Sequence, residues 1–353
     1  MGLSNNGHSV FVVTSSSSKN GDNFPFKVYR LRKPLSFKGL NINFLELPML
    51  AREFKPDVIH INYQSGGENF LIPLIRLMDI PIVLTYHADH VVLLGRIIDE
   101  IQRVSTFRLA DKILVQRERD KNRFISEGVK SSKVIFLSFN GIDQSKYKCK
   151  ELLPRKLGGL RVVCVARLDH SHRYKGVSRL IEMASLERNL FADNLISLSI
   201  IGDGDQKEGF EDLVKRNGIV GIEFLGDLGE ERLIREICAS NFLILPSVDK
   251  GEGFGRVVLE AISCGIPVAV SEFAGISEIV KKYQCGVVFN SFSDKGVFGK
   301  LISISEDNKA IQTMKENGKE MILREKLRIE DTIEKTVNIY SQLLPLKNYD
   351  KRL

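Results

Sequence analysis

Short apolar runs alternate with longer amphipathic stretches along most of this chain. In the first half the apolar runs cover residues 7–14, 56–62, 80–87, 111–116 and 133–139. In the second half they cover residues 160–167, 196–202, 222–226, 242–247, 267–271 and 286–290. Short apolar runs rich in β-branched residues are typical of buried parallel strands. Because helical patterns separate these runs, each half is predicted to form a doubly wound α/β sheet.

The helical stretches and the breaks between them predict two domains. Helices are expected at about 70–78, 91–110, 117–128, 176–190, 206–217, 229–239 and 256–264, and 309–345 reads as helix throughout. A turn at Asn140-Gly141 ends the first half, and the polar residues 146–159 have no periodicity, as in a linker. The predicted domains are therefore residues 1–150 and 151–329.

Residues 242–271 combine a strand, a loop with three glycines, a helix and a second strand. The glycines are Gly251, Gly253 and Gly255, and they stand where the strand passes into the helix. At such a position the backbone can approach an anion closely, and the helix dipole favours a phosphate. This unit is the first candidate for a binding site.

Two glutamates lie in this unit, in different surroundings. Glu252 is in the glycine loop, whereas Glu260 is inside a helix whose other residues are apolar on nearly all sides. A helix of that kind is buried, and a buried carboxylate without donors is costly. The ribose diol of a nucleotide would supply two donors to Glu260, and a neighbouring backbone amide is the alternative.

The spacing of these glutamates resembles a known signature. They stand in P-S-x(4)-E-G-F-G-x(4)-E-A-x-x-x-G-x-P-V, which is similar to the donor-sugar motif of retaining glycosyltransferases of family 4, also called glycosyltransferase group 1. The resemblance implies a GT-B fold, with two Rossmann-like domains facing a central cleft. The acceptor would bind the first domain and the nucleotide sugar the second, and a last helix at about 330–353 would pack back on the first domain.

The resemblance also implies roles for single residues. It assigns the donor diphosphate to Arg167 and Lys175 in VARLDHSHRYKG, where fixed cations would stabilise a leaving group. This loop is longer than is common in the family and also contains Arg173, so which of the three cations contacts the phosphates stays open. His87, at the end of a strand, is expected to face the transferred sugar.

Further donor contacts are expected from the second domain. Glu252, in the glycine loop, is expected to face the transferred sugar, and Glu260, in the buried helix, is expected to hold the ribose. Three residues of the glycine loop, Gly253, Phe254 and Gly255, are expected to contact the donor, and the backbone around Leu225 to hold the base. No metal and no other cofactor is expected, because Arg167 and Lys175 can neutralise the diphosphate.

Charge is unevenly divided between the two halves. The chain carries a net charge of +7, of which residues 1–150 hold +8 and residues 151–353 hold −1. A basic first half favours an anionic partner, either a membrane surface or a lipid-phosphate acceptor, with a solvated basic face as the alternative. Nucleic acid is not expected as a partner, because the chain has no basic stripe interleaved with aromatic residues.

Cysteine usage and hydropathy indicate a cytoplasmic protein, with peripheral membrane attachment as a further expectation. The five cysteines are scattered and never in C-x-x-C spacing, which favours reduced thiols and argues against a zinc site. No apolar run approaches the roughly 20 residues of a membrane span. The N-terminus also lacks the pattern of a secretory signal.

The sequence thus predicts an enzyme that moves a hexosyl or other glycosyl group from a nucleotide-diphosphate sugar to a glycan, lipid-linked or small-molecule acceptor, retaining the anomeric configuration. Two alternatives remain, a truncated or pseudo-glycosyltransferase that binds donor without turnover, and a GT-B sugar epimerase. The first alternative rests on residues 7–14, because G-H-x-V followed by a strand corresponds to the second strand of the family's first domain. Val10–Thr14 is therefore expected to lack a neighbour.

Overall fold

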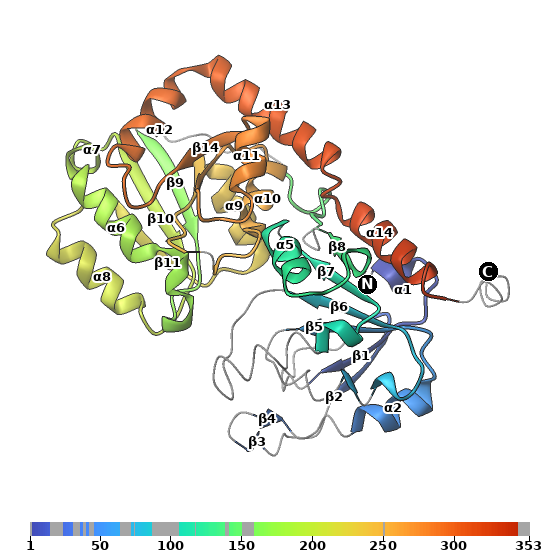
Figure 1. Ribbon diagram of the computed structural model, residues 1–353. Coiled ribbons are helices and arrows are strands. Elements are labelled where there is room, and N and C mark those ends of the chain that lie inside the picture. The colour runs from blue at the N-terminus through green and yellow to red at the C-terminus, as the bar shows by residue number, and fades with distance from the viewer. Residues whose placement is uncertain are drawn as a thin grey trace. The chain divides into compact units, whose positions relative to one another are not determined.

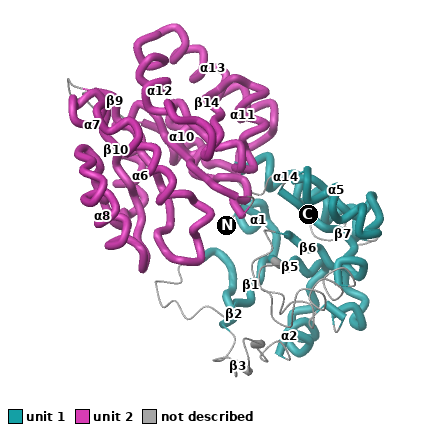
Figure 2. Tube along the Cα trace, turned by 60° about the vertical axis from the view of Figure 1, so that its left-hand side comes forward, with its two compact units in different colours: residues 1–139, 329–353 teal, residues 140–328 magenta. Residues whose placement is uncertain are grey.

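The chain divides into two compact units, residues 1–139 with 329–353 and residues 140–328 (Figure 2). The computed structural model describes residues 2–14, 24–30, 36–37, 40–41, 46–63, 72–73, 75–86, 106–116, 118–137, 141–149, 159–249 and 251–344. The first unit is interrupted after residue 139, whereas the sequence analysis placed the end of the first domain at residue 150. Among the described residues, no helix is long and apolar enough to cross a membrane.

The first unit is built on a parallel sheet. Its strands are β1 (Phe11–Thr14), β2 (Lys27–Arg30), β3 (Ser36–Phe37), β4 (Leu40–Asn41), β5 (Ile59–Tyr63), β6 (Ile82–Tyr86), β7 (Lys112–Val115) and β8 (Val134–Phe136). β5 to β8 form one parallel sheet in chain order, and β3 and β4 form a short antiparallel pair. β1 pairs in parallel with β2, and among the described residues these two strands form a sheet of their own.

The last helix of the chain packs on the first unit. The helical elements of this unit are α1 (Gly2–Asn5), α2 (Glu46–Phe54), α5 (Glu118–Ser126), the short 3₁₀ helix η2 (Ser131–Lys133) and α14 (Ile329–Ser341). Ile339 of α14 lies in one core cluster with Val83 and Leu114 of the sheet. The imidazole of His60 on β5 also hydrogen-bonds the hydroxyl of Tyr340, which ties α14 to the sheet through a polar contact.

The second unit contains one six-stranded parallel sheet. Its strands are β9 (Leu160–Val165), β10 (Ile196–Ile201), β11 (Ile222–Gly226), β12 (Phe242–Leu245), β13 (Val268–Ser271) and β14 (Gly286–Phe289). Their order in the sheet is β11-β10-β9-β12-β13-β14. All six strands begin or end close to the apolar runs that predicted them. β12 and β13 are buried along their whole length, as strands covered on both faces must be.

Helices cover both faces of this sheet (Figure 1). They are η3 (His170–Lys175), α6 (Val177–Leu186), α7 (Arg188–Ala192), α8 (Lys207–Arg216), α9 (Glu230–Ala239), α10 (Arg256–Ser263), α11 (Ser277–Tyr283), α12 (Val297–Glu306) and α13 (Asn308–Arg324). One core cluster joins the sheet to α6, α7, α8 and α12, and a second joins it to α9, α10, α11 and α13. This two-sided arrangement is the predicted doubly wound α/β fold.

Three sequence-based predictions of local structure are corrected. Residues 309–345 are not one helix, because α13 ends at Arg324 and Lys326 has a left-handed φ of +51°. The expected helix at 176–190 is divided between α6 and α7. The linker expected at residues 146–159 does not begin at residue 146, since Tyr147 is buried in the core of the second unit. The helix expected at 91–110 lies mostly outside the described residues.

Candidate active site

The candidate site lies at the carboxyl ends of β9 and β12. These adjacent strands mark the point at which the strand order of the sheet reverses, where ligands of open α/β sheets usually bind. Two loops begin here, residues 166–176 after β9 and residues 246–255 after β12. A third loop, residues 202–206, follows the neighbouring strand β10. All three belong to the second unit.

Backbone contacts hold the first two loops together. The amide of Val248 donates to the carbonyl of Tyr174 at 3.0 Å. Gly176 has a φ of +73°, and a Cβ at this position would lie 2.0 Å from the carbonyl oxygen of Pro246. Glycine is therefore required both by the left-handed backbone and by the close approach of the second loop.

An ion pair joins these two loops. The Lys175 ammonium lies 2.7 Å from Oε2 of Glu252, and the side chains are 19% and 6% exposed. The hydroxyl of Ser247 donates to the same carboxylate oxygen at 3.4 Å. A lysine ammonium has three donors, so Lys175 can keep Glu252 and still donate to an incoming anion. The structure therefore brings together two residues that the sequence analysis placed at different parts of the donor.

The two arginines of the first loop have other partners. Arg167 pairs with Asp169 at 3.0 Å and its side chain is 71% exposed. Arg173 donates to the imidazole of His170 at 2.6 Å. Both guanidinium groups line a pocket with His172 at the start of α6 and α8. The structure thus places Lys175 against the glycine loop and the two arginines around a separate pocket.

The glycine loop leads into α10 without a side-chain cap. Gly255 is the N-cap residue, with a left-handed φ of +83°. No side chain caps this end, and within the first turn the amide of Val258 donates to the carbonyl of Gly255. The N-terminus of such a helix favours an anion. Phe254 is 2% exposed and packs in the core, so it can contribute to a site through its backbone. The carbonyl of Gly253 lies against Gly275, which supports the loop from the far side.

Glu260 is buried on α10, as its sequence surroundings predict. Glu260 is 8% exposed, and its Oε1 atom lies 3.2 Å from Nε of Arg256. Burial raises the pKa of Glu260, whereas the charge of Arg256 and a hydrogen bond from Tyr147 act in the opposite direction. The sequence analysis missed Tyr147, because it lies in a polar stretch without periodicity. The aromatic ring within that stretch was the signal that could have shown it.

The remaining predicted site residues are Leu225 and His87. Leu225 lies on β11, half-buried against the core cluster that contains α9 and α10. It is therefore on the same face of the sheet as Glu260. His87 lies outside the described residues, so its expected place at the transferred sugar stays a prediction.

Comparison with known proteins identifies the family. The family described as Glycosyl transferases group 1 matches residues 150–321, and the family described as Glycosyltransferase Family 4 matches residues 1–146. The chain is a group 1, family 4 glycosyltransferase. The first of these matches contains Lys175, Glu252 and Glu260.

Individual relatives of this glycosyltransferase are distant. A sulfoquinovosyl transferase of Arabidopsis thaliana is 26% identical over 80% of the chain, and the match covers 56% of that protein's length. An N-acetyl-alpha-D-glucosaminyl L-malate synthase of Bacillus anthracis is 22% identical, with 97% of this chain and 91% of that protein covered. Anabaena HepE in complex with UDP is similar in structure, with a TM-score of 0.73, 19% identity, and 90% and 86% of the two chains covered. Such structural neighbours show the GT-B fold.

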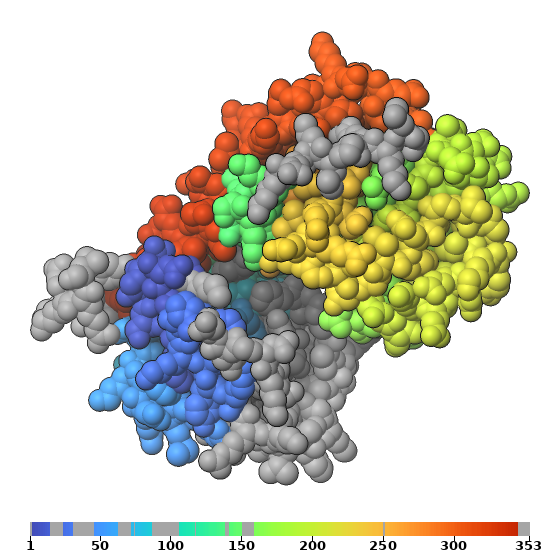
Figure 3. Space-filling model, turned by 180° about the vertical axis from the view of Figure 1, so that it is seen from behind, coloured from blue at the N-terminus to red at the C-terminus, as the bar shows by residue number. Residues whose placement is uncertain are grey.

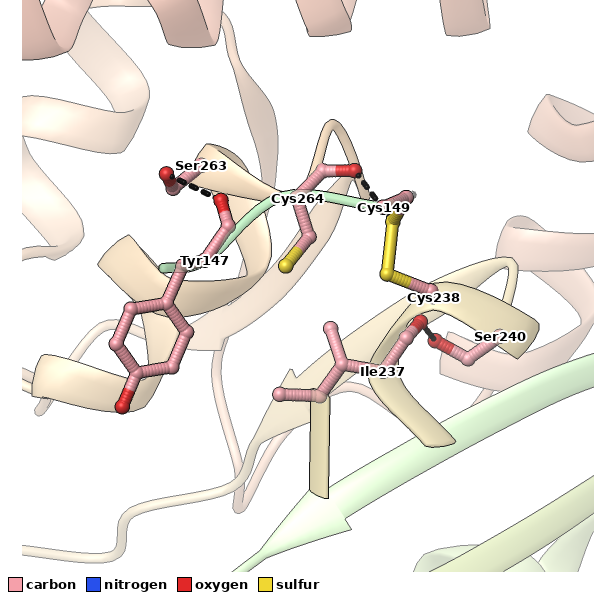
Figure 4. The surroundings of a disulfide bond; sticks show 7 residues. All are labelled: Tyr147, Cys149, Ile237, Cys238, Ser240, Ser263 and Cys264. Carbon is pink, nitrogen blue, oxygen red and sulfur yellow. Dashed lines mark hydrogen bonds between the residues drawn. A yellow bond between two sulfur atoms is a disulfide. The ribbon is translucent and has the colours of Figure 1, made fainter. Parts of the chain in front are cut away.

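The glycosyltransferase contains a disulfide bond that the sequence analysis did not expect. Cys149 and Cys238 are bonded although 89 residues separate them, and the thiol of Cys264 lies beside them (Figure 4). The expectation of reduced thiols is therefore wrong for this pair. Burial and then the charge of Glu260 raise the pKa of the Cys264 thiol to about 12.

Proposed function

We propose that this glycosyltransferase moves a sugar from a nucleotide-diphosphate sugar to an acceptor, with retention of the anomeric configuration. The observation that carries the proposal is the ion pair between Lys175 and the buried Glu252, beside the N-terminus of a helix that has no side-chain cap and also bears Glu260. This arrangement offers a cation, a carboxylate and the N-terminus of a helix within one unit. A nucleotide-diphosphate sugar matches this arrangement, because its phosphates carry negative charge and the hydroxyl groups of its ribose and sugar are hydrogen-bond donors.

The proposed roles follow from the surroundings of each side chain. Lys175 donates to a diphosphate oxygen and stabilises the charge that grows as the bond to the sugar breaks. Glu252 holds this ammonium in place and accepts from a hydroxyl of the transferred sugar. Because no second carboxylate is assigned as a base, the leaving phosphate takes the proton of the acceptor hydroxyl.

The nucleoside half of the donor is proposed to lie towards α9 and α10. Glu260 accepts from the ribose hydroxyls, which supply the donors that a buried carboxylate needs. The backbone around Leu225 contacts the base, on the same face of the sheet. A metal ion has no part in the proposal, because the ammonium of Lys175 and the guanidinium groups of Arg167 and Arg173 supply positive charge.

The acceptor is proposed to be a glycan or a lipid-linked molecule, bound by the basic residues 1–150 at the cytoplasmic face of a membrane. If their net charge of +8 serves an anionic surface, binding to acidic vesicles should fall as salt rises. Surface attraction is screened over roughly 10 Å at 0.1 M salt. Co-sedimentation with acidic and neutral vesicles measures this, and equal binding to both would refute a charge-based contact.

A panel of nucleotide sugars tests the proposed function. A donor present at 100 times its dissociation constant is expected to raise the free energy of unfolding by about 2.7 kcal/mol. Thermal unfolding with UDP-, GDP- and ADP-linked sugars identifies that donor, and product analysis with it follows. Stabilisation without any turnover would favour a binding protein, whereas conversion of the sugar without an acceptor would favour an epimerase. No stabilisation by any donor would contradict the proposal.

A further inference from the structure

Three cysteines from distant parts of the chain meet at the C-terminal end of α10. The sulfur atoms of Cys149, Cys238 and Cys264 all lie within 4.8 Å of one another. Cys238 is near the end of α9, Cys264 follows the last residue of α10, and Cys149 ends the described segment 141–149. Figure 3 shows this segment in green beside the yellow surface that contains α9. Cys238 and Cys264 are 89 and 115 residues from Cys149, so no short spacing in the sequence reveals this cysteine cluster.

Contacts other than the disulfide bond also hold the three elements of the cysteine cluster together. The hydroxyl of Ser263 on α10 donates to the carbonyl oxygen of Tyr147 in the segment at 2.8 Å (Figure 4). Tyr147 and Ile237 of α9 are buried in the same apolar core as Cys264. Because this core and this hydrogen bond do not depend on the disulfide, the three sulfur atoms are expected to stay close together when the disulfide is reduced.

The surroundings of Cys149 suit a thiol as well as a disulfide. Its sulfur lies 3.1 Å from the carbonyl oxygen of Cys264. A thiol can donate a weak hydrogen bond to this oxygen, whereas a sulfur in a disulfide has no hydrogen to donate. Cys149 and Cys238 are half-buried and Cys264 is buried, so a reductant reaches the bonded pair first. Reduction by a thiol or a phosphine adds two electrons and two protons and leaves three thiols in the cysteine cluster.

Three converging thiols have the chemistry and the spacing of a site for a soft metal ion. Thiolates are preferred ligands of Cu⁺ and Zn²⁺. Zinc–sulfur bonds are about 2.3 Å long, so the sulfur atoms around one tetrahedral zinc ion lie roughly 3.8 Å apart. Sulfur atoms that already lie within 4.8 Å of one another reach this spacing through small side-chain rotations. Burial raises the pKa of the Cys264 thiol to about 12, but a coordinating thiol still loses its proton to the metal ion.

The number of ligands limits the geometry of such a site. Among the described residues, no histidine, carboxylate or further cysteine joins the three sulfur atoms within that distance. Three thiolates suffice for Cu⁺, whereas Zn²⁺ takes a water molecule as its fourth ligand. The half-buried side of the cysteine cluster, at Cys149 and Cys238, is where this water and the ion itself would enter.

We propose that the reduced protein binds one soft metal ion, Cu⁺ or Zn²⁺, through the thiolates of Cys149, Cys238 and Cys264. The ion replaces the three thiol protons and takes over from the disulfide as the link between the segment, α9 and α10. The disulfide form cannot bind it, because two of the three ligands are then bonded to each other. The eight residues of α10 span about 12 Å, so this structural site lies at the opposite end of the helix from the glycine loop.

Metal retention by the full chain tests the proposal. The protein is reduced with a phosphine in the absence of oxygen and then incubated with Zn²⁺ alone or Cu⁺ alone, and the metal that remains after gel filtration is measured. One ion per chain is expected to remain and to raise the melting temperature. The same protein with its disulfide intact should retain none. Failure of the reduced protein to retain either ion, or equal retention by both forms, would overturn the proposal.

Cys264→Ser is the decisive variant, because it removes one thiolate and leaves the Cys149–Cys238 disulfide able to form. It is expected to weaken metal affinity at least about tenfold. The matched control is Cys285→Ser, because Cys285 is also a buried thiol but its sulfur contacts α11 and α13 instead of the cysteine cluster. This control should retain the ion, and equal retention by the two variants would refute the site.

Cys238→Ser keeps the proposal testable if Cys264→Ser does not fold. Cys238 is half-buried, so serine is easier to accommodate there than at the buried position 264. Thermal unfolding of each reduced, metal-free variant shows whether it is folded before metal is added. A folded Cys238→Ser protein that binds either ion as tightly as Cys285→Ser does would also refute the site.

Discussion

Replacing Lys175 by methionine is expected to lower turnover by about two to three orders of magnitude. In the proposed mechanism Lys175 is the cation fixed beside the glycine loop, and removing one such donor from a developing charge typically costs 10²–10³-fold in rate. The substitution also removes the cation that pairs with Glu252, whose side chain is 6% exposed. A buried carboxylate without its cation repels an anionic donor. Turnover at saturating donor measures the effect on the chemical step.

Lys282→Met is the matched control for this prediction. Lys282 also lies 2.7 Å from a carboxylate, Glu325, but it is exposed and belongs to the surface pair between α11 and the end of α13. Its loss should leave turnover close to that of the unmodified protein, because exposed ion pairs contribute little. Similar turnover for Lys175→Met and Lys282→Met would mean that Lys175 is not the catalytic cation.

Replacing Glu252 by alanine is expected to lower turnover about ten- to a hundredfold while sparing nucleotide binding. Hydrogen bonds to a charged group contribute about 1.5–3 kcal/mol, and the proposed bond joins Glu252 to the transferred sugar. A free nucleoside diphosphate lacks that sugar. Removing Glu252 also frees all three donors of Lys175 for the diphosphate. An interaction tied to the transferred group should therefore appear in turnover rather than in nucleotide affinity.

Much of the fold was predictable because local patterns determine it. Buried parallel strands have nearly continuous apolar runs, and all six strands of the second unit coincide with such runs. The break between α13 and α14 was not predictable from periodicity. It depends on the left-handed backbone of Lys326 and on the hydrogen bond from Ile142 to Leu327, which joins residues far apart in the chain.

The candidate site was predictable as a set of residues but not as a set of partners. The glycine loop, Lys175 and both glutamates could be selected from the motif and its spacing. Their pairing was not visible, because Lys175 and Glu252 come from loops after two different strands. Tyr147 was missed for the same reason, since it approaches α10 only through the fold of the whole unit.

The central claim is that a nucleoside diphosphate binds the second unit with its ribose at Glu260 and its sugar-bearing end at Glu252. Calorimetric titration of UDP, GDP and ADP into the unmodified protein, Glu260→Ala and Glu252→Ala tests it most directly. One nucleotide should bind the unmodified protein and Glu252→Ala with similar affinity, and should bind Glu260→Ala more weakly by about 1–3 kcal/mol. Equal weakening by both substitutions, or none by Glu260→Ala, would contradict this assignment of the two glutamates.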